Sequence, residues 1–194
     1  FASLQELADY TMEAAIHLTR SSVGYVAFAN HDESVLTMYA WSREAMAECN
    51  VVNKPLEYPV AETGLWGEAV RQRRAIVTND YQAPSRWKRG LPEGHVPLAR
   101  HMNVPIFEDD RIVVVAGVGN KDSDYDETDV RQLTLLMSGM WRIVQRQRVE
   151  EALRDSETRY RLLADNMNDV LWLWDVAGAR FTYVSPSVER LAGY

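Results

Sequence analysis

The chain has 194 residues, of which 46% are hydrophobic and 25% charged, a balance typical of a globular protein with a sizeable core. Its formal net charge of -7 argues against a protein whose main task is to grip the phosphate backbone of nucleic acid. The single cysteine, Cys49, excludes an internal disulfide framework and a cluster of thiolate metal ligands. No apolar run reaches the roughly 20 residues of a membrane span, and we expect a cytoplasmic location.

The first half of the chain reads as alternating short helices and strands. In chain order we expect a helix at 3–19, strands at 24–29 and 35–41, a short helix at 42–48, an extended piece at 56–60, a short helix at 65–70 with Thr63 as its N-cap, and a strand at 75–78. Residues 81–100 then form a long connection rich in proline, glycine and basic residues. A connection of that length inside a compact domain is often functional.

The second half begins with a hairpin of strands 103–107 and 111–119. The run from Ile112 to Val118 is apolar at every position, which indicates a central strand covered on both faces. A long helix should then start at Asp126 or Thr128 and continue to about residue 164. These elements predict an α+β fold, a mainly antiparallel sheet with helices packed on it.

The last residues predict a new fold that begins without finishing. A helical segment leads into a strand at 170–175, an Ala-Gly turn, a second strand at 180–184 and a further helix start before Tyr194. We therefore expect the chain to be a piece of a longer modular protein, with its output domain downstream.

Four groups of residues carry a family resemblance. They are Thr63-Gly64-Leu65-Trp66-Gly67-Glu68-Ala69-Val70, the strand Ala75-Ile76-Val77-Thr78-Asn79-Asp80, the triplet Val104-Pro105-Ile106, and Gly117-Val118-Gly119-Asn120-Lys121 followed by Tyr125 and Asp129. With the element order, they resemble a GAF domain over residues 1–147. Residues 156–194 resemble the opening of a PAS domain. The resemblance implies a GAF sensory domain at 1–147, a helical, coiled-coil linker at 148–160 and a truncated PAS domain at 161–194.

The GAF-PAS order is similar to the sensory half of bacterial multi-sensor histidine kinases. It implies a sensory and dimerising region that transmits the state of an unknown small ligand through its exit helix. Two alternatives stay open, the GAF-PAS region of a cyclic-di-GMP cyclase or phosphodiesterase and a ligand-free dimer spacer. We expect no enzyme in this stretch, because it carries no glycine-rich phosphate loop and no nucleophile elbow.

The candidate ligand residues come from the short helix at 65–70 and the long connection. Trp66 and Trp87 could stack on a flat ligand, and His95, Arg100 and His101 could meet an anionic one. The alternative is a surface loop with solvated charges and one anchoring tryptophan.

A second candidate set is Asn120, Lys121, Tyr125 and Asp129. It is similar to the Asn-Lys…Phe…Asp-Glu motif of cyclic-nucleotide-binding GAF domains, with Tyr125 in the Phe place and Val130 in the Glu place. The alternative is structural: Lys121 pairs with Asp129, while Asn120 and Tyr125 hold the turn into the long helix.

Cofactor signals are weak throughout. A covalent bilin, as in phytochrome-like GAF domains, would need a cysteine near residues 98–101, and none stands there. His95 and His101 have no cysteine or further histidine near them, so we expect no metal site, and no pattern supports haem or flavin.

The long helix has two apolar series with alternating steps of four and three residues. One includes Met137, Met140 and Val144, and the other, displaced by two positions, includes Leu153. Such spacing predicts the seam of a parallel homodimer with a phase change near residue 147. It fits equally well a helix that packs first on the GAF sheet and then on the following domain.

Overall fold

The computed structural model describes residues 3–48, 56–89, 95–166 and 169–193. Cys49 and the middle of the long connection lie outside these ranges. The chain divides into two compact units, Phe1–Val144 and Gln145–Tyr194, and each is described by itself.

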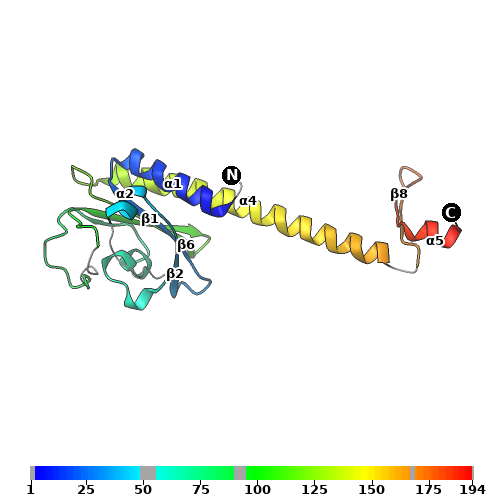
Figure 1. The fold of residues 1–194 in the computed structure, drawn as a ribbon, viewed down its shortest axis with the longest axis horizontal. Coiled ribbons are helices and arrows are strands. Elements are labelled where there is room, and N and C mark those ends of the chain that lie inside the picture. Colours follow the sequence, from blue (N-terminus) through cyan, green and yellow to red (C-terminus); the bar gives the residue numbers. More distant parts are fainter. Residues whose placement is uncertain (1–2, 49–55, 90–94, 167–168, 194) are drawn as a thin grey trace. The chain divides into compact units, whose positions relative to one another are not determined.

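The first unit is built on a six-stranded antiparallel sheet in the order β3-β2-β1-β6-β5-β4 (Figure 1). Its strands are β1 (Val23–Ala29), β2 (Val35–Trp41), β3 (Glu57–Pro59), β4 (Ile76–Thr78), β5 (His101–Glu108) and β6 (Arg111–Gly119). Strand β6 lies between β1 and β5, and Val114 is paired with Phe28 on one side and Ile106 on the other. The central strand expected from its continuous apolar run is confirmed.

Within the described ranges, four α-helices and two 3-10 turns complete the unit. They are α1 (Leu4–Thr19), α2 (Arg43–Glu48), η1 (Val60–Glu62), η2 (Leu65–Gly67), α3 (Glu68–Arg71) and α4 (Glu127–Asn166), whose second half belongs to the second unit. Asp126 caps α4, because its carboxylate accepts hydrogen bonds from the backbone N–H groups of Thr128 (2.7 Å) and Asp129 (3.1 Å). The α+β fold class is confirmed.

The prediction that Thr63 caps a helix is wrong. Its hydroxyl donates to the Val60 carbonyl (2.7 Å), so Thr63 closes the η1 turn before it. The chain then makes a separate 3-10 turn over 65–67, and the α-helix starts only at Glu68.

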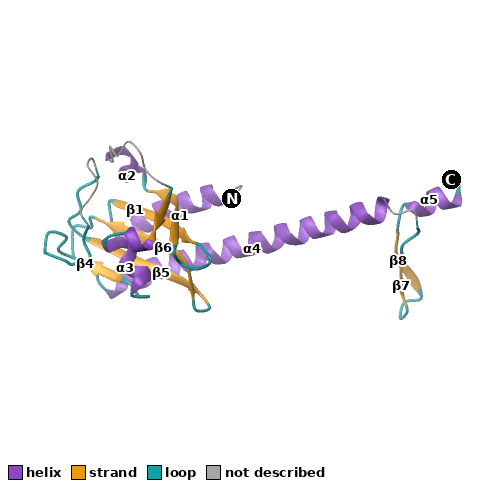
Figure 2. Cartoon of the chain, turned by 90° about the horizontal axis from the view of Figure 1, so that it is seen from below, coloured by secondary structure: helices purple, strands orange, loops and turns teal. Residues whose placement is uncertain are grey.

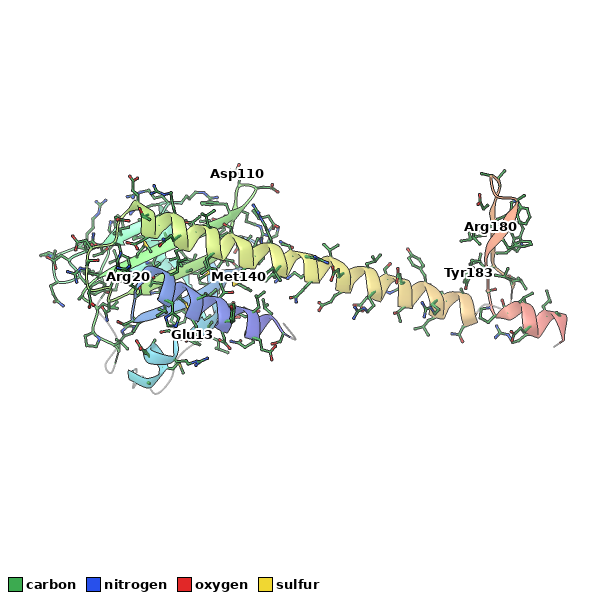
Figure 3. The ribbon with its side chains drawn as sticks, turned by 90° about the horizontal axis from the view of Figure 1, so that it is seen from above. Glu13, Arg20, Asp110, Met140, Arg180 and Tyr183 are labelled. Atoms are coloured by element: carbon green, nitrogen blue, oxygen red, sulfur yellow. The ribbon has the colours of Figure 1, made fainter. Side chains whose placement is uncertain are left out.

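Helices α1 and α4 cover one face of the sheet, which we call the helical face (Figures 2 and 3). Figure 3 looks onto this face, with Met140 labelled on α4 and Glu13 on α1. Met137, Met140 and Val144 are buried there among sheet residues such as Val104. Their spacing therefore reflects packing on the sheet, and their interpretation as dimer-seam residues is corrected.

The opposite face, here called the ligand face, is covered by short elements in the part of the chain that the structure describes. Val60 of η1, Leu65 of η2 and Val70 of α3 pack on it, against Leu36 and Val115 among others. In Figure 2, α3 lies over this side of the sheet, while α4 runs behind it. Short covering elements leave room between them, unlike two long helices.

The second unit comprises the rest of α4, the hairpin of β7 (Trp172–Asp175) and β8 (Arg180–Val184), and α5 (Ser187–Ala192). The Phe181 ring lies between two tryptophans, with ring centroids 5.7 Å from Trp172 and 4.7 Å from Trp174. All three rings remain exposed, as do Val149, Leu153, Tyr160 and Leu163 of α4. This unit presents much apolar surface to solvent.

Substitution of two leucines of α4 tests which face of this helix stabilises the first unit. We expect Leu133→Ala to lower the free energy of unfolding by about 2–5 kcal/mol, because Leu133 is fully buried on the sheet. Leu135→Ala is the matched control, since Leu135 is 73% exposed, and its effect should stay within about 0.5 kcal/mol. Urea unfolding followed by circular dichroism measures both, and equal losses would contradict the packing.

Candidate ligand-binding site

A row of aromatic and polar side chains crosses the ligand face and is called the aromatic–polar row. Its members, from the β3 edge towards the β4 edge, are Tyr58, Trp66, Tyr25, Asn103, His101 and Tyr81. The Trp66 ring meets Tyr58 and Tyr25 edge-on, at centroid distances of 5.2 and 5.6 Å. Such contacts make the row a continuous lining rather than a set of isolated side chains.

Hydrogen bonds join the middle of the row. The Tyr25 hydroxyl donates to Asn103 Oδ1 (2.7 Å), and Asn103 Nδ2 lies 3.5 Å from His101 Nδ1. Because the amide nitrogen is the donor, His101 Nδ1 accepts, and its proton sits on Nε2. Burial lowers the pKa of His101 to about 4, so the imidazole is neutral at pH 7. Burial also raises the pKa of the Tyr25 hydroxyl far above its usual value, and the row carries no charge there.

Gly117 of β6 explains why these side chains can lie flat on the sheet. A Cβ atom at this position would stand 2.2 Å from Tyr25 Cε1 and 2.3 Å from Asn103 Oδ1. Any larger residue would therefore push Tyr25 and Asn103 off the strand. The centre of the ligand face is closely packed.

Open space lies at the β4 edge of this face, in what we call the edge pocket. It has a volume of about 480 Å³, within the range of small-molecule sites. Its lining residues are Asn79, Asp80, Gln82, Pro97, Leu98, Ala99, Arg100 and Asn120. The Tyr81 backbone N–H binds the Ala99 carbonyl (2.9 Å), and the Tyr81 ring meets His101 edge-on, so the pocket adjoins the end of the row.

Asn120 ties the wall of the edge pocket to the end of β6. It has a left-handed backbone (φ 60°), and its side chain accepts from Ala99 N (2.9 Å) and donates to the Pro97 carbonyl (2.8 Å). Its own N–H binds the Arg100 carbonyl (3.0 Å). One side chain thus fixes the course of residues 97–100.

Arg100 and Lys121 continue this connection into α4. Arg100 Nε lies 3.1 Å from Asp124 Oδ1, and its Nη1 donates to the Lys121 carbonyl (3.3 Å). Lys121 Nζ in turn lies 2.8 and 2.6 Å from the two carboxylate oxygens of Asp129, in the first turn of α4. These are the contacts that the structural alternative for the Asn120–Asp129 set requires.

Tyr125 anchors the same turn to two other elements. Its hydroxyl shares a hydrogen bond with Ser21 Oγ (2.7 Å) after α1, and its backbone exchanges two bonds with the Asn79 side chain after β4 (2.8 and 3.0 Å). Burial raises the pKa of Tyr125 to about 12, so it stays a neutral phenol. The set around Asn120 is a structural junction at the start of α4.

The five ligand residues predicted from the sequence do not form one site. His101 lies in the aromatic–polar row, with His95 close enough to influence its pKa, and Trp66 lies in the other half of the same row, between Tyr58 and Tyr25. Arg100 lines the edge pocket, and Trp87 lines a separate small pocket. His95 donates from Nδ1 to the Val96 carbonyl (2.8 Å) and is half-buried.

Sequence reasoning missed Tyr25, Asn103 and Asn79. Asn103 offered a signal, because an amide inside a buried apolar strand has to find a hydrogen-bond partner. Within the described residues no group of three or more histidine, cysteine or acidic side chains is arranged to hold a metal ion. The described helices include none that is long and apolar enough to cross a membrane.

The depressed pKa of His101 predicts how stability depends on pH. In the unfolded chain its pKa returns to about 6.5, so the unfolded state binds more protons as pH falls towards 4, and stability is lost in that window. Between pH 7 and 5 we expect His101 to account for about 2 kcal/mol of lost stability.

Urea unfolding at the two pH values checks this prediction. His101→Gln should remove that part of the pH dependence, while the matched control His31→Gln, at an exposed position, should keep it. An unchanged pH profile in His101→Gln would show that the imidazole is not held neutral by burial.

Several solved structures share this fold. A GAF domain of a phosphoenolpyruvate-protein phosphotransferase from Coxiella burnetii superposes with a TM-score of 0.64 at 12% identity, covering 78% of this chain and 88% of that one. Residues 122 to 287 of a methyl-accepting chemotaxis protein give 0.62 at 15% identity, covering 77% and 93%. A free methionine-R-sulfoxide reductase from Neisseria meningitidis gives 0.53 at 14% identity, covering 75% and 81%. The third is an enzyme by name, so the fold alone does not decide between sensing and catalysis.

The chain is more similar in sequence to another protein than to these structures. A methyl sulfide methyltransferase-associated sensor from Methanosarcina acetivorans is 58% identical over 153 residues, which cover 79% of this chain and 15% of that protein. The chain thus spans only a small part of the length of this relative. The model of the GAF domain family matches residues 2–145, the stretch that carries the sheet, the edge pocket and the start of α4. The chain belongs to the GAF domain family.

Proposed function

We propose that this chain is the small-ligand sensory region of a larger signalling protein, a sensor histidine kinase, and has no catalytic activity of its own. The family membership and the relative named as a sensor support this proposal. The edge pocket is the proposed ligand site, and α4 is the proposed output element.

One observation carries the proposal: a residue that lines the edge pocket also holds the turn that leads into α4. Arg100 lines the pocket and also holds Asp124 and the Lys121 carbonyl, and Lys121 holds Asp129 in the first turn of α4. A ligand that moves residues 97–100 must therefore strain or relax the junction at the base of the helix. It needs a different affinity for two arrangements of that junction to act as a signal.

The second unit is proposed to be the opening of a PAS domain that receives this signal. A two-stranded hairpin is only marginally stable by itself in water. Further strands of a complete PAS domain would cover the exposed rings of Trp172, Trp174 and Phe181. The downstream sequence distinguishes the kinase from the cyclic-di-GMP cyclase or phosphodiesterase, since each output domain has its own motifs. A ligand-free spacer is excluded if the edge pocket binds a ligand.

We also propose a parallel homodimer whose seam is the exposed series Val149, Leu153, Tyr160 and Leu163 of α4. Leu153→Glu should shift the dimer to monomer in sedimentation velocity experiments at high micromolar concentration, because it places a charge in the seam. The matched control is Leu162→Glu, because Leu162 is exposed to a similar degree but lies off the series. A monomeric wild-type chain, or equal effects of the two changes, would contradict the seam.

The ligand site is tested with dimethyl sulfide and methanethiol, probes suggested by the relative's name, in a thermal unfolding assay. Binding should raise the melting temperature. Ala99→Trp should abolish the shift, because Ala99 is an exposed lining residue whose larger replacement fills the pocket. Ala99→Ser is the control and should keep it. A shift that survives Ala99→Trp would place the ligand elsewhere.

The effect of a bound probe on α4 is measured separately, by hydrogen exchange of the backbone amides of residues 126–133. A bound probe should change the exchange of these amides in the wild-type chain. Asp124→Asn should leave binding intact and reduce that change, because Asp124 pairs with Arg100 without lining the pocket. Asp122→Asn, in the same exposed turn, serves as the control.

A further inference from the structure

A second, smaller pocket lies where the 81–89 segment folds back on η1 and η2. It has a volume of about 190 Å³, and none of its described lining residues also lines the edge pocket. Its lining residues are Ala61, Thr63, Arg71, Arg86, Trp87 and Arg89. Arg89 Nη2 closes it by donating to the Ala61 carbonyl (3.0 Å). Among its six described lining residues three are arginines and none is acidic, so we call it the basic pocket.

Arg71 belongs to the framework of this pocket. Its guanidinium pairs with the buried carboxylate of Glu68 and donates to the carbonyls of Val60, Thr63 and Gly64 and to the Thr63 hydroxyl. All five of its N–H groups are therefore occupied, and its charge is balanced. The excess positive charge of the pocket comes from the other two arginines.

Arg86 and Arg89 have no carboxylate within ion-pair distance in the part of the chain that the structure describes. The Arg86 guanidinium stacks over the Trp87 ring, 4.3 Å from its centroid. Stacking occupies the face of the guanidinium and leaves the N–H groups at its rim free to donate. Arg89 donates one hydrogen bond, from Nη2 to the Ala61 carbonyl, and its other N–H groups can still donate to a ligand. Two cations without a carboxylate partner among the described residues thus line one small pocket of a chain whose net charge is -7.

We propose that the basic pocket binds a small tetrahedral oxyanion of the phosphate or sulfate class, held by Arg86 and Arg89 against the Trp87 ring. Two guanidinium groups offer more N–H donors than the two oxygens of a carboxylate can accept, whereas phosphate and sulfate present four oxygens. The volume is below the about 300–1,000 Å³ of sites for larger molecules, so the anion, or one such group of a ligand, fills it.

A bound oxyanion would join the 86–89 segment to the turns beneath it. It would neutralise two like charges that otherwise repel each other, and so hold this part of the connection closed over the ligand face. The site is independent of the edge pocket and of the sensory role proposed above.

The test is thermal unfolding of the chain at pH 7.5 in inorganic phosphate, sulfate, acetate or chloride at equal ionic strength. Phosphate and sulfate should raise the melting temperature of the wild-type chain above its value in chloride, and acetate should not. Arg86→Gln and Arg89→Gln should each weaken the apparent affinity for phosphate about tenfold, the effect of losing one charged hydrogen bond. Arg131→Gln is the matched control, since Arg131 is exposed on α4 across the sheet.

Tryptophan fluorescence gives a second readout that needs no arginine variant. Phosphate should change the emission of the wild-type chain, and Trp87→Phe should lose this change while the phosphate-induced rise in melting temperature persists. Equal stabilisation by chloride, an equal response to acetate, wild-type affinity in both arginine variants, or an emission change that survives Trp87→Phe would each overturn the proposal.

Discussion

Strand β6 constrains the whole first unit, because its side chains are apolar on both faces and each face has to be covered. Long helices cover the helical face, since one stripe of α1 and one of α4 suffice to bury it. Among the described residues, the ligand face receives η1, η2, α3 and part of the long connection, and no long helix. Gaps form where short segments meet, and both pockets are lined mainly by such segments.

This division separates the pockets from α4 by the thickness of the sheet. Contacts between the edge pocket and the start of α4 therefore run around an edge of the sheet. The contacts that the structure describes lie at the β4 edge. Asn79, Arg100 and Asn120 lie there, and each binds a residue of the 120–125 turn or the wall next to it. The buried pair of Lys121 and Asp129 fastens that turn to α4. Such a pair is costly to break, because the remaining charge would be left without its partner.

Local patterns in the sequence predicted most of the elements. One of the two interpretations of the Asn120–Asp129 set included the Lys121–Asp129 pair, whose residues lie only eight positions apart. Local patterns did not predict the partner of Asn103, since Tyr25 lies 78 residues away and meets it only through the register of β1, β6 and β5. The four-and-three spacing of Met137 and Met140 fits a dimer seam and a sheet-packing stripe alike, and burial separates the two. The long connection looked like one site because sequence order does not show that Trp87 and Arg100 line different pockets.

The aromatic–polar row also bears on where a ligand can enter. Tyr25 covers Gly117 and satisfies Asn103, which is fully buried. A ligand that displaced Tyr25 would leave the Asn103 amide without its donor, at a cost of about 1–3 kcal/mol, unless it supplied a hydroxyl or N–H group in the same place. Binding in the edge pocket carries no such free-energy cost, since its space is already open. A ligand would therefore enter the edge pocket at a lower cost than the row, whose neutral side chains already satisfy one another's hydrogen bonds.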